Sequence, residues 1–274
     1  MIARLKSFRE RLLSLTHTPP AALDRSHKVH LFHWRPPDGR QNFGDHLSSA
    51  IVTKMAAERA CFLDEMVAKP QRLLAIGSII HYAADGDVVW GSGVNGSVSD
   101  DLHTYSMLDV RSVRGPLTAN FLEKRGITVP QIFGDPALLT ARLMGQRFAR
   151  PEKKAPVAYI PHFLALDEMR DWENMISPYL PWAEVIRRIL AAEHVISSSL
   201  HGLVIADTFG IPCTYLRLDD GEALFKYEDY VLGAGRERLE VTTSKAEAVR
   251  ASPMPPIKPQ LDTLYGAFPW DLWD

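Results

Sequence analysis

The chain has 274 residues and a formal net charge of −2, with 46% hydrophobic and 23% charged residues. This composition is typical of a soluble globular protein, and the near-neutral charge excludes a broad basic surface for nucleic acid. The two cysteines, Cys61 and Cys213, form no CxxC pair, which favours a reducing compartment. No apolar run approaches the roughly 18–20 residues that span a bilayer.

Residues 1–20 form a basic N-terminal segment without the long apolar region of a secretory signal. Its apolar residues recur at helical spacing between arginines and lysines: Leu5, Phe8, Leu12 and Leu15. The pattern predicts an amphipathic helix that ends before Pro19. Two interpretations stay open, a helix packed on the domain or frayed at the terminus, and a helix that attaches to an anionic membrane surface.

After residue 20, apolar strands alternate with amphipathic helices. In the first part we expect strands at 28–34, 72–78, 87–93, 108–113 and 130–135, and helices at 43–58 and 116–126. The charged, proline-bracketed stretch 147–156 is the best candidate for a linker. Beyond it we expect strands at 156–163, 194–199 and 211–218, helices at 180–193 and 202–210, and a last helix within 255–273.

This alternation predicts an α/β protein with parallel sheets covered by helices on both faces. Two such units around a linker predict two Rossmann-like domains that face each other across a cleft. We place their boundaries at 21–146 and 147–274, with the last helix free to return to the first domain.

Polar and glycine-rich stretches follow several of the predicted strands: QNFGDHL, GSGVNG, SVRGPLT, FGDPALL and SSSLHGL. In open parallel sheets, ligands bind at the carboxyl ends of the strands. Asn42 and Asp45 are therefore candidates to contact a ligand or to cap the next helix, and Gly44 allows a close backbone approach. The run Gly91, Ser92 and Gly93 is a weak phosphate-loop signal, because it matches neither GxGxxG nor GxxxxGK[ST].

Two further residues at these turns carry stronger signals. Arg114 precedes a helix start at Pro116, where its guanidinium suits either a carboxylate or phosphate ligand or a structural ion pair. His201 lies in the turn between a strand that ends near Ser198 and a helix that starts near Gly202, so we expect it in the cleft. An imidazole there suits proton transfer near neutral pH. Ser199 is placed to cap that helix or to donate to an anion.

These motifs, in this order, resemble the polysaccharide pyruvyltransferase family, in particular the bacterial exopolysaccharide ketal-pyruvyltransferases of the succinoglycan and xanthan type. The matching stretches run from NFGDHLSSAIV through SVRGPLTANFLEKRGI and SSSLHGLVIADTFGIP to FKYEDY, over roughly residues 41–230. The resemblance implies a GT-B-like fold and transfer of a pyruvyl group from phosphoenolpyruvate to a sugar, which forms a ketal. It also implies a lipid-linked oligosaccharide acceptor at the cytoplasmic face of the inner membrane, and it requires no metal or redox cofactor.

The resemblance gives each candidate an expected role. His201 is the expected general acid and base. The expected phosphoenolpyruvate-binding residues are Arg114, Ser199, Leu200 and Gly202, with Arg217 or Lys226 as a second cation. The residues expected to contact the acceptor or support catalysis, on the first-domain side, are Asn42, Gly44, Asp45, Gly91, Ser92, Gly93 and Asp135.

Two other functions stay open from the residues alone. One is a glycosyltransferase of the same fold that uses a nucleotide sugar, although no base-binding and ribose-binding site follows residues 194–199. The other is a non-catalytic, glycan-binding member of a polysaccharide assembly complex.

Overall fold

The computed structural model describes residues 27–36, 38–148, 151–219 and 223–274. The N-terminal segment 1–20 lies outside the described residues, so its amphipathic helix stays a prediction. The linker at 147–156 is described only in part. Among the described residues, no helix is long and apolar enough to cross a membrane.

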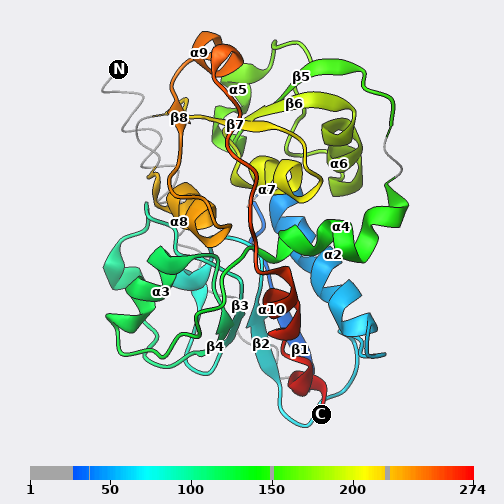
Figure 1. Ribbon diagram of the computed structural model, residues 1–274. Helices are drawn as coiled ribbons and strands as arrows, with labels where there is room; N and C mark the ends of the chain where they lie inside the picture. The colour runs from blue at the N-terminus through cyan, green and yellow to red at the C-terminus, as the bar shows by residue number, and fades with distance from the viewer. Residues whose placement is uncertain (1–26, 37, 149–150, 220–222) are drawn as a thin grey trace.

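Two four-stranded sheets, both entirely parallel, organise the chain (Figure 1). The first sheet has the order β1-β2-β3-β4, with strands Val29–Phe32, Gln71–Leu74, Val88–Trp90 and Asp109–Ser112. The second has the order β5-β6-β7-β8, with strands Ala155–Ile160, Ala192–Ser197, Cys213–Leu216 and Val241–Thr242. The predicted α/β class with two parallel sheets, as in two Rossmann-like domains, is confirmed.

Helices cover these sheets and fill the space between them. They are α2 (Phe43–Ala57), α3 (Pro116–Glu123), α4 (Thr140–Met144), α5 (Leu166–Met169), α6 (Trp182–Leu190), α7 (Leu200–Thr208), α8 (Phe225–Gly233), α9 (Lys245–Arg250) and α10 (Leu261–Gly266). Helix α7 lies centrally between the two sheets (Figure 1). Its apolar residues are buried in a hydrophobic core that also contains residues of α2, α6 and β6, so one core joins the two halves of the chain.

Local sequence explains where the helices near the cleft begin. The Asn42 side chain caps α2, because its Oδ1 accepts a hydrogen bond from the N–H of Gly44 at 3.0 Å. Pro116 occupies the first turn of α3, where its missing N–H costs no helical hydrogen bond. Both helices therefore start directly at the ends of connections that follow strands β1 and β4.

Two expected elements differ from the structure. Residues 130–135 form no strand, because Pro130 lacks a backbone N–H donor and Gly134 has a positive φ of 146°. One parallel bridge, between Phe133 and Val113, forms in this stretch. Helix α7 begins at Leu200, two residues earlier than expected. His201 therefore lies in the first helical turn rather than in the preceding loop.

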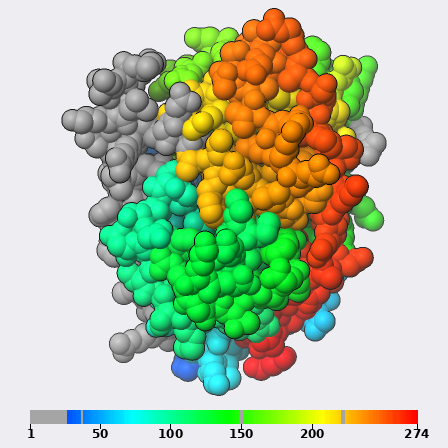
Figure 2. All heavy atoms as spheres, turned by 60° about the vertical axis from the view of Figure 1, so that its left-hand side comes forward, coloured from blue at the N-terminus to red at the C-terminus, as the bar shows by residue number. Residues whose placement is uncertain are grey.

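The C-terminal tail leaves the second sheet and runs down to the first (Figures 1 and 2). There α10 lies against the first sheet, where the Trp90 indole N–H donates to the carbonyl of Leu264 at 2.9 Å. Trp270 is 8% exposed, and its indole N–H donates to the carbonyl of Met55. Trp270 is thus a core residue.

Candidate active site

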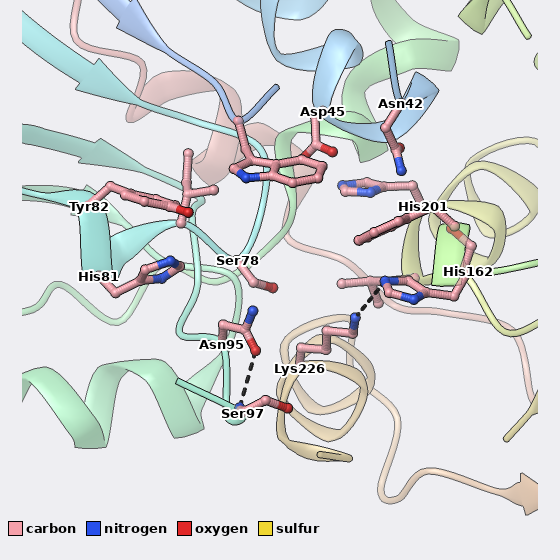
Figure 3. Close-up of a pocket in the computed structure, with 15 residues that line it drawn as sticks. Asn42, Asp45, Ser78, His81, Tyr82, Asn95, Ser97, His162, His201 and Lys226 are labelled. Atoms are coloured by element: carbon pink, nitrogen blue, oxygen red, sulfur yellow. Dashed lines mark hydrogen bonds between the residues drawn. The ribbon is translucent and has the colours of Figure 1, made fainter. Parts of the chain in front are cut away.

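A pocket lies between the two halves of the chain, where the ends of strands from both sheets meet (Figure 3). Its lining includes Asn42 and Asp45 from the start of α2, Ser78 after β2, and Asn95 after β3. The second half contributes His162 after β5, the start of α7, and Lys226 from α8. This is the position expected for a ligand site in parallel α/β sheets.

His201 reaches this pocket from the first turn of α7 and packs closely against α2. A Cβ atom on Gly44 would lie 2.1 Å from His201 Nδ1, so only glycine allows this approach. The Phe43 ring meets the imidazole edge-on, with centroids 6.4 Å apart. The helix that begins with NFGD therefore fixes the position of the histidine in SLHG.

A buried carboxylate lies on the other side of the imidazole. Asp135 Oδ2 is 3.6 Å from His201 Nε2, and the Asp135 side chain is 1% exposed. Neither of these two atoms has a hydrogen-bond partner among the described residues. Asp135 Oδ1 is held by the N–H of Ala137 at 2.9 Å. A proton on Nε2 of His201 would therefore face Asp135.

Asp45 adds a second titratable group to the pocket. Burial raises the pKa of its carboxyl to about 6, and the nearby charge of Asp135 adds to this rise. His201 and Lys226 act in the opposite direction on the same pKa. A carboxyl with a pKa near 6 exchanges protons close to neutral pH.

The second half contributes the cationic side of the pocket. Lys226 Nζ is 3.5 Å from His162 Nε2. The N–H of His162 donates to Ser198 Oγ at 2.8 Å, and the Tyr227 hydroxyl donates to the carbonyl of Ser198 at 2.6 Å. The end of β6 thus holds both His162 and the helix that carries Lys226. Ser199 and Leu200, at the start of α7, also line the pocket.

Arg114 does not line the pocket, in contrast to the direct anion contact that we expected. It is 1% exposed, and its guanidinium pairs with Asp229 of α8 at 3.0 Å. Its remaining contacts are to Ser78 Oγ at 2.6 Å and the carbonyl of Val94 at 2.8 Å. Of these partners, Ser78 faces the pocket. The guanidinium therefore supports the pocket from behind.

We expected Gly91, Ser92 and Gly93 to contact a ligand. Like Arg114, they lie behind the pocket and do not line it. A Cβ atom on Gly93 would lie 2.3 Å from Arg114 Cζ, and one on Gly91 would lie 2.3 Å from Pro136 Cδ. Ser92 is fully buried, and its hydroxyl donates to the carbonyl of Gly77. These small residues let the guanidinium and Pro136 pack directly on the strand end.

Two other expected ligand contacts also lie elsewhere. Gly202 is buried in the first turn of α7, where an added Cβ atom would lie 2.3 Å from Ser197 Oγ. Arg217 follows β7, and its Nε donates to the carbonyl of Asp219 rather than lining the pocket. We expected either Arg217 or Lys226 to supply a second cation, and of these two residues Lys226 lines the pocket.

Sequence reasoning missed several lining residues: Trp34, Ser78, Ile79, His81, Tyr82, Asn95, Ser97, His162 and Phe163. Ser78 and His162 follow strands β2 and β5, so the rule that located His201 would have found them too. Trp34 and Tyr82 carry no local signal, because aromatic residues near strands are typical of a core. Among the described residues, no group of three or more His, Cys, Asp or Glu side chains is placed to hold a metal ion.

Fold and site together define an α/β protein with a pocket between two parallel sheets, lined by His81, His162, His201 and Lys226 among other residues. Residues 72–220 match the family described as Polysaccharide pyruvyl transferase. The chain belongs to this family, and the family implies that it is an enzyme.

Individual proteins are also similar to this chain. The chain is 30% identical over 234 residues to the succinoglycan biosynthesis protein ExoV of Rhizobium meliloti (strain 1021), covering 80% of this chain and 70% of the relative. It is 26% identical over 216 residues to an uncharacterized protein of Acanthamoeba polyphaga mimivirus, covering 72% of each. The crystal structure of a functionally uncharacterized protein from Klebsiella pneumoniae has a TM-score of 0.51 and 13% identity, over 88% of this chain and 99% of that one. That likeness shows the fold alone.

Proposed function

We propose that this enzyme transfers a pyruvyl group from phosphoenolpyruvate to a sugar of an exopolysaccharide repeat unit and forms a pyruvate ketal. The observation that carries the proposal is the position of His201, between the buried carboxylate of Asp135 and a pocket that also contains Lys226. The similarity to a succinoglycan biosynthesis protein supports the exopolysaccharide as the acceptor.

The donor is a small anion that carries a carboxylate and a phosphate. We place it against Lys226 and the start of α7, at Ser199 and Leu200. The first N–H groups of a helix have no intrahelical acceptor, and the helix dipole favours negative charge there. The Lys226 ammonium adds a full positive charge on the same side.

His201 then supplies the proton that starts the reaction. Its imidazolium protonates the methylene carbon of phosphoenolpyruvate, and the neighbouring carbon becomes an oxocarbenium-like centre. A sugar hydroxyl adds to this centre, and its proton passes to a base in the pocket. Asp135 would stabilise the imidazolium through Nε2.

The second half of the reaction closes the ketal. The carbon–oxygen bond to phosphate breaks, phosphate leaves, and a second hydroxyl of the same sugar adds to the same carbon. The proton of that hydroxyl needs an acceptor, and Asp45, whose pKa is raised to about 6, is suited to carry it. Asn42 lies beside it on the acceptor side of the pocket.

The acceptor in this proposal is a lipid-linked oligosaccharide at the cytoplasmic face of the inner membrane. The basic amphipathic pattern of residues 2–15 would hold the enzyme at that anionic surface. Flotation of full-length protein with anionic vesicles, compared with a variant lacking residues 1–18, tests this part. Equal recovery of the two proteins would exclude a role for the segment.

The experiment for the reaction itself uses the purified full chain, labelled phosphoenolpyruvate and a glycolipid fraction. We expect release of inorganic phosphate and entry of label into an acid-labile ketal. His201→Gln should abolish both while the thermal transition stays unchanged. Lys226→Gln should weaken phosphoenolpyruvate binding by about tenfold or more. Neither phosphate release nor labelled product from the wild type would refute the proposal.

A further inference from the structure

The pocket has two walls of different chemistry. His201, His162 and Lys226 lie on one side in Figure 3, and His81 and Tyr82 lie on the opposite side. We define the first-domain wall as Trp34, Ser78, His81, Tyr82, Asn95 and Ser97. It carries no carboxylate, ammonium or guanidinium group.

Trp34 is the large aromatic surface of this wall, and it has aromatic neighbours from both halves of the chain. Tyr82 lies beside it: burial raises the pKa of the Tyr82 hydroxyl, and the Trp34 side chain acts on that pKa in the opposite direction. Its ring also contacts that of Phe163 from the second half, with centroids 5.5 Å apart and an interplanar angle of 35°. Trp34 is partly buried and lines the pocket, so part of its aromatic surface is available to a ligand there.

His81 strengthens the neutral character of the wall. Its ring contacts that of Tyr82, with centroids 4.0 Å apart and an interplanar angle of 41°, and the residue is 8% exposed. Burial lowers the pKa of its imidazole to about 3, so it is uncharged near neutral pH. The imidazole of His81 therefore adds no positive charge to this wall near neutral pH.

Asn95 supplies a hydrogen-bonding group with a fixed orientation. Its Oδ1 accepts a hydrogen bond from the N–H of Ser97 at 3.1 Å. The amide nitrogen consequently points away from Ser97 and towards the interior of the pocket (Figure 3). Ser78 lies next to it with a hydroxyl, so two short polar groups follow the aromatic surface along the wall.

A flat apolar surface beside short uncharged polar groups matches a pyranose ring, which has an apolar C–H face and hydroxyls around its edge. We propose that the first-domain wall is the acceptor subsite: the sugar ring lies on the Trp34 indole, and its hydroxyls bond to Asn95 and Ser78. This inference rests on the proposed function, and it adds where in the pocket the acceptor sugar binds. Because both walls line one cavity, a ring seated on Trp34 presents its far edge to Asp45 and His201.

Saturation-transfer difference NMR on the full chain tests the subsite, with methyl β-D-glucopyranoside, methyl β-D-galactopyranoside and methyl α-D-mannopyranoside as probes and phosphoenolpyruvate present. We expect saturation transfer to the ring C–H protons of at least one glycoside. Trp34→Ala should reduce it about tenfold, whereas Trp34→Phe should retain much of it, because a flat ring remains.

Trp273→Ala is the matched control, because Trp273 lies in the C-terminal tail and donates to the carbonyl of Phe62, away from the pocket. Phosphoenolpyruvate binding, measured by calorimetry, should be the same in wild type and both Ala variants. No transfer to any of the three glycosides, or equal transfer in Trp34→Ala and wild type, would overturn the subsite. Failure of phosphoenolpyruvate to bind would instead contradict the proposed function.

Discussion

Arg114, which precedes α3 in the first half of the chain, forms a buried ion pair with Asp229 of α8 in the second half, at 3.0 Å. Asp229 also accepts hydrogen bonds from the N–H and the hydroxyl of Thr118. A Cβ atom on Gly115 would lie 1.9 Å from the carbonyl oxygen of Asp229, so the two segments are in close contact. The pair fixes the helix that carries Lys226 against the first half.

Breaking this pair should be costly, because one charge would remain buried without a partner. We expect Asp229→Ala to lower the free energy of unfolding by about 3–5 kcal/mol. Asp271→Ala breaks the partly exposed pair of Asp271 with Arg111 and should cost at most about 1 kcal/mol. Urea denaturation of the two variants checks this. Similar losses in both would contradict the structural role of Arg114.

Gly44→Ala should affect turnover more than stability. The new Cβ would come within 2.1 Å of His201 Nδ1, so the imidazole must move. We expect kcat to fall on the order of a hundredfold, as for other small displacements of reacting groups. Gly145→Ala is the control, because no atom lies within 4 Å of its added Cβ. A Gly44→Ala enzyme with wild-type kcat would show that His201 tolerates displacement.

The Asp135→Asn variant should show whether Asp135 positions and charges the imidazole of His201 or only maintains the local structure. Asn retains the shape and the capping oxygen but removes the charge that faces His201 Nε2. We expect kcat to fall on the order of 10²-fold or more, with a changed pH–rate profile and little change in the KM for phosphoenolpyruvate. Asp262→Asn, at an exposed pair with Arg142, is the control. An unaltered pH profile would remove Asp135 from proton transfer.

Acid should destabilise the protein through its buried histidines. Burial lowers the pKa of His103 to about 4 and that of His81 to about 3, both below the ordinary value of 6.5. Between pH 6.5 and these lower values, the unfolded chain binds protons that the folded chain does not. The stability that these histidines contribute is therefore complete above pH 6.5 and is lost as the pH falls towards 3.

Urea midpoints between pH 7.5 and 4.5 measure this loss. His103→Phe should make the decline shallower than in the wild type, whereas His27→Phe, at an exposed position, should leave the slope unchanged. The raised pKa of Asp45 has the opposite effect on stability, because the folded state then gains stability as the pH falls. Asp45 is present in all three proteins, so its effect cancels from the comparison. Equal slopes in wild type and His103→Phe would refute the prediction.

Periodicity and turn residues in the sequence located the two parallel sheets and most of the helices that surround the pocket. They also placed His201, Asn42, Asp45 and Lys226 in stretches that border it. These signals are local: an apolar strand ends, and a polar residue or glycine follows. The expected strand at 130–135 was wrong because proline and a positive-φ glycine interrupt the apolar run at Phe133.

The sequence by itself determined the parallel α/β architecture and, through its ordered motifs, the family. Tertiary structure alone decided which turn residues line the pocket. Arg114 and His201 have equivalent local signals, yet Arg114 is buried by Asp229, 115 residues away in the chain, and His201 reaches the pocket. Pairing over such a distance depends on how the two halves pack, and that packing is set by the shared core around α7 rather than by any pattern near Arg114.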